Sequence, residues 1–368
     1  MMTHRMMTQT PTIDSRLDVF RDPLPGAATS PYLRFVDRML RGVSQVVFQS
    51  NWLTGLLILA AIGFNSPPYL VAALVGTAVS TLTAVALSVD RGLIDAGLLG
   101  FNGCLAGIGL NFYLSQDITA GDWPGTRAYL FIILAAAFTT VIFGALGSLL
   151  GCRSVPALTA PFVFGSWLFL FGVFQFADLH PGSPLVPVIP ADLTTSGGYT
   201  AGTVWNATFK GIGEIFFQDN AVSGVIMAVA VLVNTRIGAL MMVAGPVVAA
   251  LVAMGFGADA GAVDAGLYGF NASLTAIALG GFFYVSNPAG MLYTLFGVLV
   301  TTFVWPAFAV ALAPVGMPTF TFPFVLTTWF FLLAKPAFGA LRPVAPADAT
   351  YPEDNLRRYR RGELAPGF

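Results

Sequence analysis

The polar and aromatic residues of this chain that could do chemistry recur in two matched sets. These sets form three blocks that keep one order in both halves: residues 45–51 match 214–220, residues 95–103 match 264–272, and residues 158–163 match 320–325. The shift is 169 residues for the first two pairs of blocks and 162 for the third, which also aligns Trp167 with Trp329. Three matched blocks in one order indicate that a single fold unit is duplicated within the chain.

Phenylalanine and threonine residues in these blocks predict a narrow slot. The four phenylalanines are Phe48, Phe101, Phe217 and Phe270. Their rings would form flat apolar walls, while backbone carbonyls freed at helix interruptions and the hydroxyls of Thr159 and Thr321 would line the edges. A small planar neutral molecule with amide N–H groups would fit such a slot. Ions would lose their hydration there and be excluded.

Constellations for catalysis or metal binding are missing from the apolar stretches of the sequence. The two histidines, His4 and His180, lie in polar segments, and no P-loop or HExxH motif occurs. Without a nucleophile and base pair, an enzyme is disfavoured. We therefore expect no enzymatic activity, no cofactor, no metal and no nucleic-acid partner.

Few ionisable residues lie between the polar ends of the chain. The candidates are Asp90, Asp95, Glu214, Asp219 and Asp264. Coupled transport normally needs a buried titratable relay, so this small set favours passive conduction. A proton- or ion-coupled transporter of a small neutral amide, using Glu214 or Asp219, stays open as an alternative. A channel for another small neutral solute is the second alternative.

Two repeated pairs in the blocks have structural interpretations. Asp95 and Asp264 precede Ala-Gly-Leu and are predicted to cap the helix that carries Gly-Phe-Asn. Asn102 and Asn271 are predicted to hydrogen-bond to backbone where a helix is interrupted.

Composition predicts an all-α integral membrane protein. Of the 368 residues, 56% are hydrophobic and only 10% are charged, far below the quarter or so typical of soluble domains. Six of the 17 Lys and Arg residues lie at or before Arg41 and six at or after Lys335. The positive-inside tendency then places both termini in the cytoplasm, so the number of crossings is even. We expect the membrane to be the plasma (inner) membrane.

Apolar stretches predict five crossings in each half, preceded by a half-helix that enters the membrane and stops. We place the half-helices at 31–49 and 199–218. The crossings are expected near 52–65, 68–89, 93–114, 128–150 and 155–177, then near 221–233, 237–256, 264–284, 290–313 and 320–334. Prolines in the last stretch of each half predict a broken helix. An odd number of crossings per half makes the two units inverted, with one pore where interrupted helices meet.

These patterns divide the chain into five parts. They are a disordered arm (1–30), a first membrane repeat (31–178), a linker (179–198), a second membrane repeat (199–340) and a polar C-terminal tail (341–368).

The doubled Gly-Phe-Asn blocks, the Gln45 and Glu214 pair, and the Leu-Thr-Ala-Pro-Phe and Phe-Thr-Phe-Pro-Phe pair resemble the urea transporter family, in its bacterial-type, channel-like form. The resemblance covers residues 45–334. It implies a homotrimer embedded in membrane lipid, with one passive urea path in each protomer.

The resemblance also implies roles for individual residues. Solute would lie against Phe48, Phe101 and Leu105 in one half and against Phe217, Phe270 and Leu274 in the other. The constriction would be formed by Thr159, Thr321, Val46 and Ile215. The side chains of Gln45 and Glu214 would receive urea N–H groups, one at each mouth, so the two mouths would differ chemically.

Overall fold

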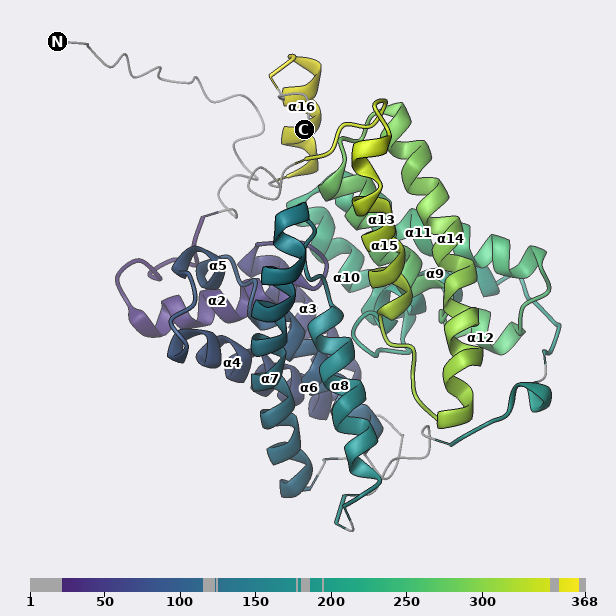
Figure 1. Cartoon of the computed structure of the whole chain (residues 1–368), viewed down its shortest axis with the longest axis horizontal. Coiled ribbons are helices and arrows are strands. Elements are labelled where there is room, and N and C mark those ends of the chain that lie inside the picture. The colour runs from purple at the N-terminus through teal and green to yellow at the C-terminus, as the bar shows by residue number, and fades with distance from the viewer. Residues whose placement is uncertain are drawn as a thin grey trace.

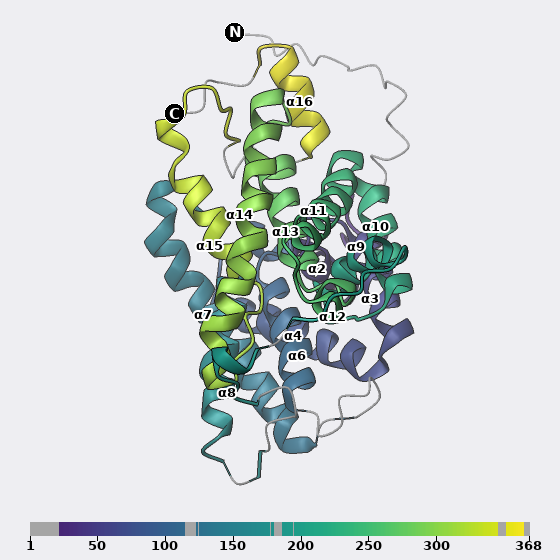
Figure 2. The ribbon, with the colours of Figure 1, turned by 90° about the vertical axis from the view of Figure 1, so that its right-hand side faces the viewer.

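The computed structural model of the chain is all-α in the part that it describes, which comprises residues 22–114, 123, 125–176, 178–179, 186–193, 195–344 and 351–363. Residues 1–21 of the predicted N-terminal arm lie outside these ranges. A single bridge, between Tyr284 and Pro343, is the one strand-like pairing within them. The first half (purple to teal) lies beside the second (green to yellow) in Figures 1 and 2.

Helices of the two halves follow one another in the same order. The first half contains α2 (Pro31–Gln45), α3 (Trp52–Asn65), α4 (Pro67–Ala86), α5 (Arg91–Asp95), α6 (Gly100–Leu114), α7 (Thr126–Leu150) and α8 (Ala160–Val173). The second contains α9 (Thr203–Glu214), α10 (Ala221–Asn234), α11 (Arg236–Gly255), α12 (Ala260–Asp264), α13 (Gly269–Ile277), α14 (Pro288–Leu312) and α15 (Phe322–Leu333). The π-helix η3 (Ala278–Phe283) extends α13.

Matched capping residues explain why these helices begin where they do. Asn51 accepts a hydrogen bond from the N–H of Thr54 at the start of α3, and Asn220 caps α10 in the same way. Ser66 caps α4 and Thr235 caps α11. A side-chain acceptor satisfies backbone N–H groups that have no partner in the first turn. Each cap lies 169 residues from its counterpart, so the duplicated sequence dictates duplicated helix starts.

The predicted stretches at 93–114 and 264–284 are each divided by a turn. Asp95 and Asp264 are the last residues of α5 and α12, so the prediction that they cap the following helix is wrong. Gly97 follows with φ +79°, and a Cβ on it would lie 2.4 Å from the backbone nitrogen of Gly42 in α2. A side chain has no room there, and the left-handed φ also favours glycine. The turn thus docks on the half-helix.

Prolines do not break the last helix of each half. Pro161 and Pro323 lie in the first turns of α8 and α15, where a missing N–H costs nothing. These helices begin at Ala160 and Phe322, so the prediction of a crossing from residue 155 started too early. The prolines inside helices are Pro246 in α11 and Pro306 in α14.

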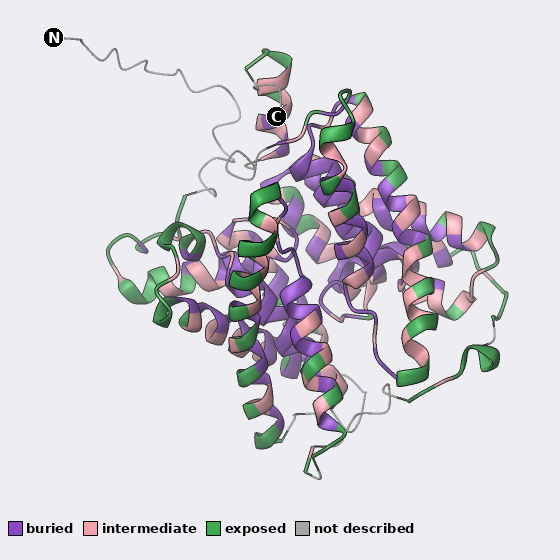
Figure 3. Cartoon of the chain, in the orientation of Figure 1, coloured by how far each residue is buried: buried purple, intermediate pink, exposed green. Residues whose placement is uncertain are grey.

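The long helices carry large apolar side chains outward. Four helical stretches are long and apolar enough to cross a membrane: Pro67–Ala86, Thr126–Arg153, Arg236–Gly255 and Pro288–Val315. In the most apolar part of Thr126–Arg153, only 28% of the residues are buried. Exposed leucines such as Leu134 cover its outer face. Figure 3 shows buried residues gathered inside both halves. An apolar exterior of this size suits lipid.

The C-terminal tail contains structure that its polar sequence did not predict. Helix α16 (Pro352–Arg360) projects beyond the other helices at the top of Figures 1 and 2. Glu353 accepts hydrogen bonds from the Thr235 hydroxyl and from the N–H groups of Arg236 and Ile237, at 2.7–2.9 Å. A carboxylate at the N-terminus of α11 is favourable because the helix dipole is positive there.

Candidate functional site

Thr159 and Thr321 meet at the centre of the molecule. Their hydroxyl oxygens are 2.6 Å apart, and each side chain is 3% exposed. The two residues precede the first turns of α8 and α15, one from each half. The sequence predicted both residues for the site, and the structure brings them into direct contact.

Two asparagines hold the helix starts that carry these threonines. Asn102 donates to the carbonyl of Leu158 at 3.3 Å and accepts from the N–H of Phe162 at 3.0 Å. Asn271 makes the same two bonds, to the carbonyl of Phe320 and from the N–H of Phe324, at the same distances. The prediction that both asparagines bind backbone at an interruption is confirmed. Their amides fix the turn before each threonine.

Leu158 and Phe320 explain why those turns need holding. Their φ angles are +53° and +48°, in the left-handed region that side chains other than glycine rarely adopt. Phe48 and Phe217, at the ends of the half-helices, are left-handed as well, with φ of +64° and +59°. Strained backbone of this kind persists only where surrounding contacts impose it.

The rings of Phe48 and Phe217 lie against aromatic side chains around α8 and α15. The Phe48 ring centroid is 6.1 Å from that of Phe324, and the Phe217 centroid is 6.3 Å from that of Phe162. Phe48 also stacks on Phe282 of η3 at 5.4 Å. Each half-helix end is therefore packed on the start of α15 or α8.

Gly109 of α6 gives the Phe217 ring its room. A Cβ at this position would be 3.0 Å from the ring's Cζ. Real Cβ atoms are rarely so close to another carbon, so any larger residue would push the ring out of place.

Two amide networks, one buried and one partly buried, tie the half-helix ends to the opposite half. Asn234 donates to Gln49 Oε1 at 2.6 Å and accepts from Asn51 at 3.2 Å. In the corresponding network, Asn65 donates to Gln218 Oε1 at 2.8 Å and accepts from Asn220 at 3.2 Å. Gln49 and Gln218 also donate to the carbonyls of Val47 and Phe216, next to the site phenylalanines.

Two tryptophans make a second reciprocal pair of contacts between the halves. Trp167 Nε1 donates to the carbonyl of Pro318 at 2.7 Å, and Trp329 Nε1 donates to the carbonyl of Pro156 at 2.9 Å. Because each tryptophan belongs to one half and each proline to the other, both bonds cross between α8 and α15.

Gln45 and Glu214, the last residues of α2 and α9, have different surroundings. Gln45 donates to the carbonyl of Ala96 at 2.9 Å. The Glu214 carboxylate makes no hydrogen bond or ion pair within the described part of the chain. Lys210, one turn before it, binds Asp219 at 2.9 Å and lies 3.7 Å from Asp264.

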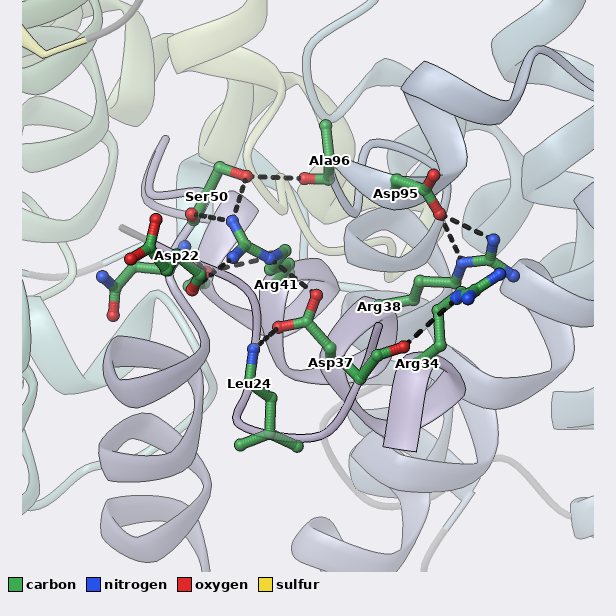
Figure 4. A network of polar contacts seen from close by, with 12 residues as sticks. Asp22, Leu24, Arg34, Asp37, Arg38, Arg41, Ser50, Asp95 and Ala96 are labelled. Carbon is green, nitrogen blue, oxygen red and sulfur yellow. Dashed lines mark hydrogen bonds and ion pairs between the residues drawn. The ribbon is translucent and has the colours of Figure 1, made fainter. Parts of the chain in front are cut away.

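A cation occupies the corresponding position in the first half. Arg41 aligns with Lys210, binds Asp37 at 2.9 Å and donates to the carbonyl of Ser50 at 2.6 Å (Figure 4). Arg38 pairs with Asp95 at 2.6 Å. Both half-helices therefore carry a paired cation one turn before their last residue.

The other predicted site residues are buried in α6 and α13 or directly after the half-helices. Phe101 and Phe270 are 7% and 8% exposed, and the fully buried side chains are Leu105 and Leu274 in α6 and α13. Val46 and Ile215 are buried directly after the half-helices. No ring contact joins Phe48 to Phe101 or Phe217 to Phe270 within the residues that the structure describes.

Comparisons with known proteins agree with this repeated, helical site. The profile of the family described as "Urea transporter" matches residues 36–336. Urea transporter 1 of Ovis aries is 34% identical over 328 residues, which cover 89% of this chain and 84% of the relative. Urea transporter 1 of Rattus norvegicus is 32% identical over the same shares of both chains. The chain belongs to the urea transporter family.

The family resemblance seen in the sequence is thus confirmed, with one correction. The relatives compared are mammalian, so they do not single out the bacterial-type form. Membership in a transporter family also confirms that the chain is not an enzyme.

In this urea transporter, sequence reasoning missed the residues of the two amide networks. Gln49, Asn51 and their counterparts lay inside a matched block, so a signal was present. Asn65 and Asn234 also lie 169 residues apart, immediately before the caps of α4 and α11, but outside the matched blocks. Searching the whole chain for polar pairs at that shift would have found them.

Proposed function

We propose that this chain conducts urea and close amide analogues passively, through one pore lined by both halves. The contact between Thr159 and Thr321 carries the proposal. It brings together two buried hydroxyls at two helix starts, which form one acceptor-rich position on a path between the halves. Membership in the urea transporter family supports urea as the solute.

The proposed architecture is two inverted repeats of five crossings, each with a re-entrant half-helix, at 31–178 and 199–340. Reciprocal contacts support a two-fold relation, because the tryptophan bonds and the amide networks between the halves each have a matched counterpart. The linker at 179–198 and the two terminal segments, 1–30 and 341–368, would lie outside the repeats.

In the proposed pore, urea passes between two sets of apolar walls. One set comprises Phe48, Phe101 and Leu105, and the other comprises Phe217, Phe270 and Leu274. The lack of ring contact within each phenylalanine pair is consistent with a flat molecule passing there. Val46 and Ile215 would narrow the path beside the threonines. Gln45 and Glu214 would accept urea N–H groups at opposite mouths.

Passive conduction is favoured over coupling by the fixed charges near Glu214. A carrier of protons or ions needs a group that exchanges its charge during the cycle. Asp219 is paired with Lys210, as described above, so it is poorly suited to that exchange. The alternative of a coupled transporter would rest on Glu214 alone.

We infer a homotrimer with one pore in each protomer, embedded in the lipid of the plasma (inner) membrane, with both termini cytoplasmic. Apolar exposed helices and the clustering of Lys and Arg near the chain ends support the membrane setting.

Stopped-flow light scattering tests the proposal. Purified protein in liposomes is exposed to an inward urea gradient, with glycerol and formamide as comparison solutes. We expect fast reswelling with urea, unchanged by an uncoupler, and slow reswelling with glycerol. Accumulation of urea above the external concentration that an uncoupler abolishes would contradict the passive mechanism. Folded protein without urea flux would contradict the proposed solute.

A further inference from the structure

An arginine-lined pocket opens on the outer surface of the first half, away from the central threonines. It has a volume of about 620 Å³ and lies among the start of α2, the end of α4 and helix α5. Three arginines and two aspartates line it: Arg34, Arg38, Arg91, Asp90 and Asp95. Val85, Val89 and Ile94 add an apolar surface.

In the second half, the linker binds at the matching place. Ser196 of the linker donates from its N–H and its hydroxyl to Asp259, at 2.9 and 2.7 Å. Its carbonyl accepts from the N–H of Ala260 at 2.8 Å. The positions that match the three arginines are Thr203, Ala207 and Ala260. This half therefore carries none of the three arginines at these positions.

In the first half, the segment before α2 follows another route and leaves the pocket open. Leu24 donates to Asp37 at 2.9 Å (Figure 4). The guanidinium of Arg34 donates to the carbonyls of Ala27 and Ala28. These bonds draw the segment toward Arg41. Asp90, which matches Asp259, therefore only caps the N–H of Leu93.

Arg91 is the arginine that this arrangement leaves available. Its side chain is exposed, and its guanidinium makes no hydrogen bond or ion pair within the described residues. Arg38 is neutralised by Asp95. Three arginines against two aspartates give the pocket one net positive charge, centred on Arg34 and Arg91.

We propose that this pocket binds the phosphodiester headgroup of an anionic phospholipid. A phosphodiester carries one negative charge, which matches the pocket, and guanidinium groups fit phosphate oxygens with paired hydrogen bonds. Exposed apolar side chains continue from the pocket along the end of α4. Leu82, Val85 and Leu87 are 52%, 45% and 59% exposed, so they can contact the acyl chains.

The position of the pocket at the end of a membrane-spanning helix supports a lipid over a free phosphate as the ligand. Helix α4 is one of the four stretches long enough to cross a membrane, and the pocket lies at its C-terminal end. The ends of spanning helices lie at the level of lipid headgroups. A free phosphate would use the same arginines but would gain nothing from the leucines beside them.

Native mass spectrometry and thermal unfolding of the full chain in detergent test this inference. Each sample is titrated with phosphatidylglycerol, phosphatidylcholine or the water-soluble headgroup glycerophosphoglycerol. We expect phosphatidylglycerol to bind and raise the unfolding temperature, with phosphatidylcholine weaker. Arg91→Ala should lower the phosphatidylglycerol affinity about fivefold, the effect of one cation at a membrane surface, and Arg91→Lys should restore most of it.

Arg153→Ala is the matched control, because Arg153 is also an exposed arginine but lies outside the pocket. Equal phosphatidylglycerol affinity in Arg91→Ala and the unaltered chain would overturn the proposal, as would an equal loss in Arg153→Ala. Binding of glycerophosphoglycerol as tight as that of the whole lipid would identify a soluble phosphate site instead. These readouts are independent of urea flux, so they stand or fall separately from the proposed transport function.

Discussion

At the scale of single residues, the two central hydroxyls offer the sharpest test of the proposed path. Replacing Thr159 or Thr321 with valine keeps the side-chain shape and removes one hydroxyl. We expect either change to slow urea flux about 3- to 10-fold, the effect of one neutral hydrogen bond on a barrier. Stopped-flow light scattering measures the change.

Thr302→Val is the matched control for that prediction. Thr302 is equally buried, but its hydroxyl bonds only to the carbonyl of Val298 in its own helix. Its valine variant should keep normal flux. Unchanged flux in both central variants would remove the threonines from the filter.

The proposed role of Glu214 as an acceptor at the pore mouth can be tested by replacing it with glutamine, the residue at the matching position of the first half. Glu214→Gln copies Gln45 and keeps an amide oxygen as an acceptor, so flux should stay within about twofold. Glu214→Ala removes the acceptor and should slow urea flux about tenfold. Normal flux in a folded Glu214→Ala protein would contradict the mouth role. Circular dichroism checks the folding of both variants.

At the scale of elements, the amide networks should stabilise the pairing of the halves. Asn65→Leu and Asn234→Leu each remove the donor to a buried glutamine Oε1, of Gln218 and Gln49 respectively, so each should lower the free energy of unfolding by about 1–3 kcal/mol. The two networks share no residue, so the double variant should show nearly additive losses. Thermal unfolding in detergent measures the series.

Asn206→Leu is the control for the network variants. Asn206 makes one bond, to the carboxylate of Asp264, near the surface. Its loss should cost about 0.5 kcal/mol or less. An equal decrease in the free energy of unfolding for Asn206→Leu and Asn234→Leu would show that the amide networks stabilise the protein no more than one surface hydrogen bond.

The linker contact at Asp259 should depend on pH. Hydrogen bonds from the hydroxyl and N–H of Ser196 lower the pKa of Asp259 to about 2. Because the folded pKa lies below the unfolded value of about 3.9, this contact stabilises fully above the unfolded value and is lost as the pH falls toward 2. In the unaltered chain, the protection of the amides around Ser196 from hydrogen exchange should therefore fall in acid. Asp259→Asn should lower this protection at neutral pH and remove its dependence on acid, as hydrogen exchange can measure. Acid-sensitive exchange that persists in Asp259→Asn would assign the effect elsewhere.

Elements also show what the sequence could and could not predict. Matched blocks predicted the helices that end at Gln45 and Glu214 and the meeting of Thr159 with Thr321, because positions in a duplicated unit share one environment. The bond from Asn234 to Gln49 joins residues 185 positions apart, and no local pattern specifies such a partner. The turns after Asp95 and Asp264 were missed because continuous apolarity hides a break that packing of Gly97 on Gly42 imposes. Helix α16 was missed because Glu353 anchors it to the start of α11. These residues are far apart in the sequence, and no local pattern indicates the contact.

At the scale of the whole molecule, a pore in each protomer predicts independent transport. Wild-type and Glu214→Ala chains with different tags can be co-expressed and mixed oligomers purified. If each protomer conducts alone, flux should rise linearly with the fraction of wild-type chains. Light scattering of the detergent complex should give three times the chain mass of 38.8 kDa. A steeper than linear dependence would indicate one pathway shared between chains.

The crossed tryptophan bonds carry a consequence for the origin of the molecule. Each half supplies one tryptophan donor and one proline carbonyl acceptor, and each pairs with the opposite group of the other half. A surface that carries both members of a contact in this way is complementary to a second copy of itself. The half that supplies Trp167 also supplies the Pro156 carbonyl that the opposite tryptophan needs. An ancestral chain of half this length would have carried both members of the contact and could have formed a symmetric dimer. Fusion of two gene copies would then have preserved an existing interface, after which Gln45 and Glu214 were free to diverge.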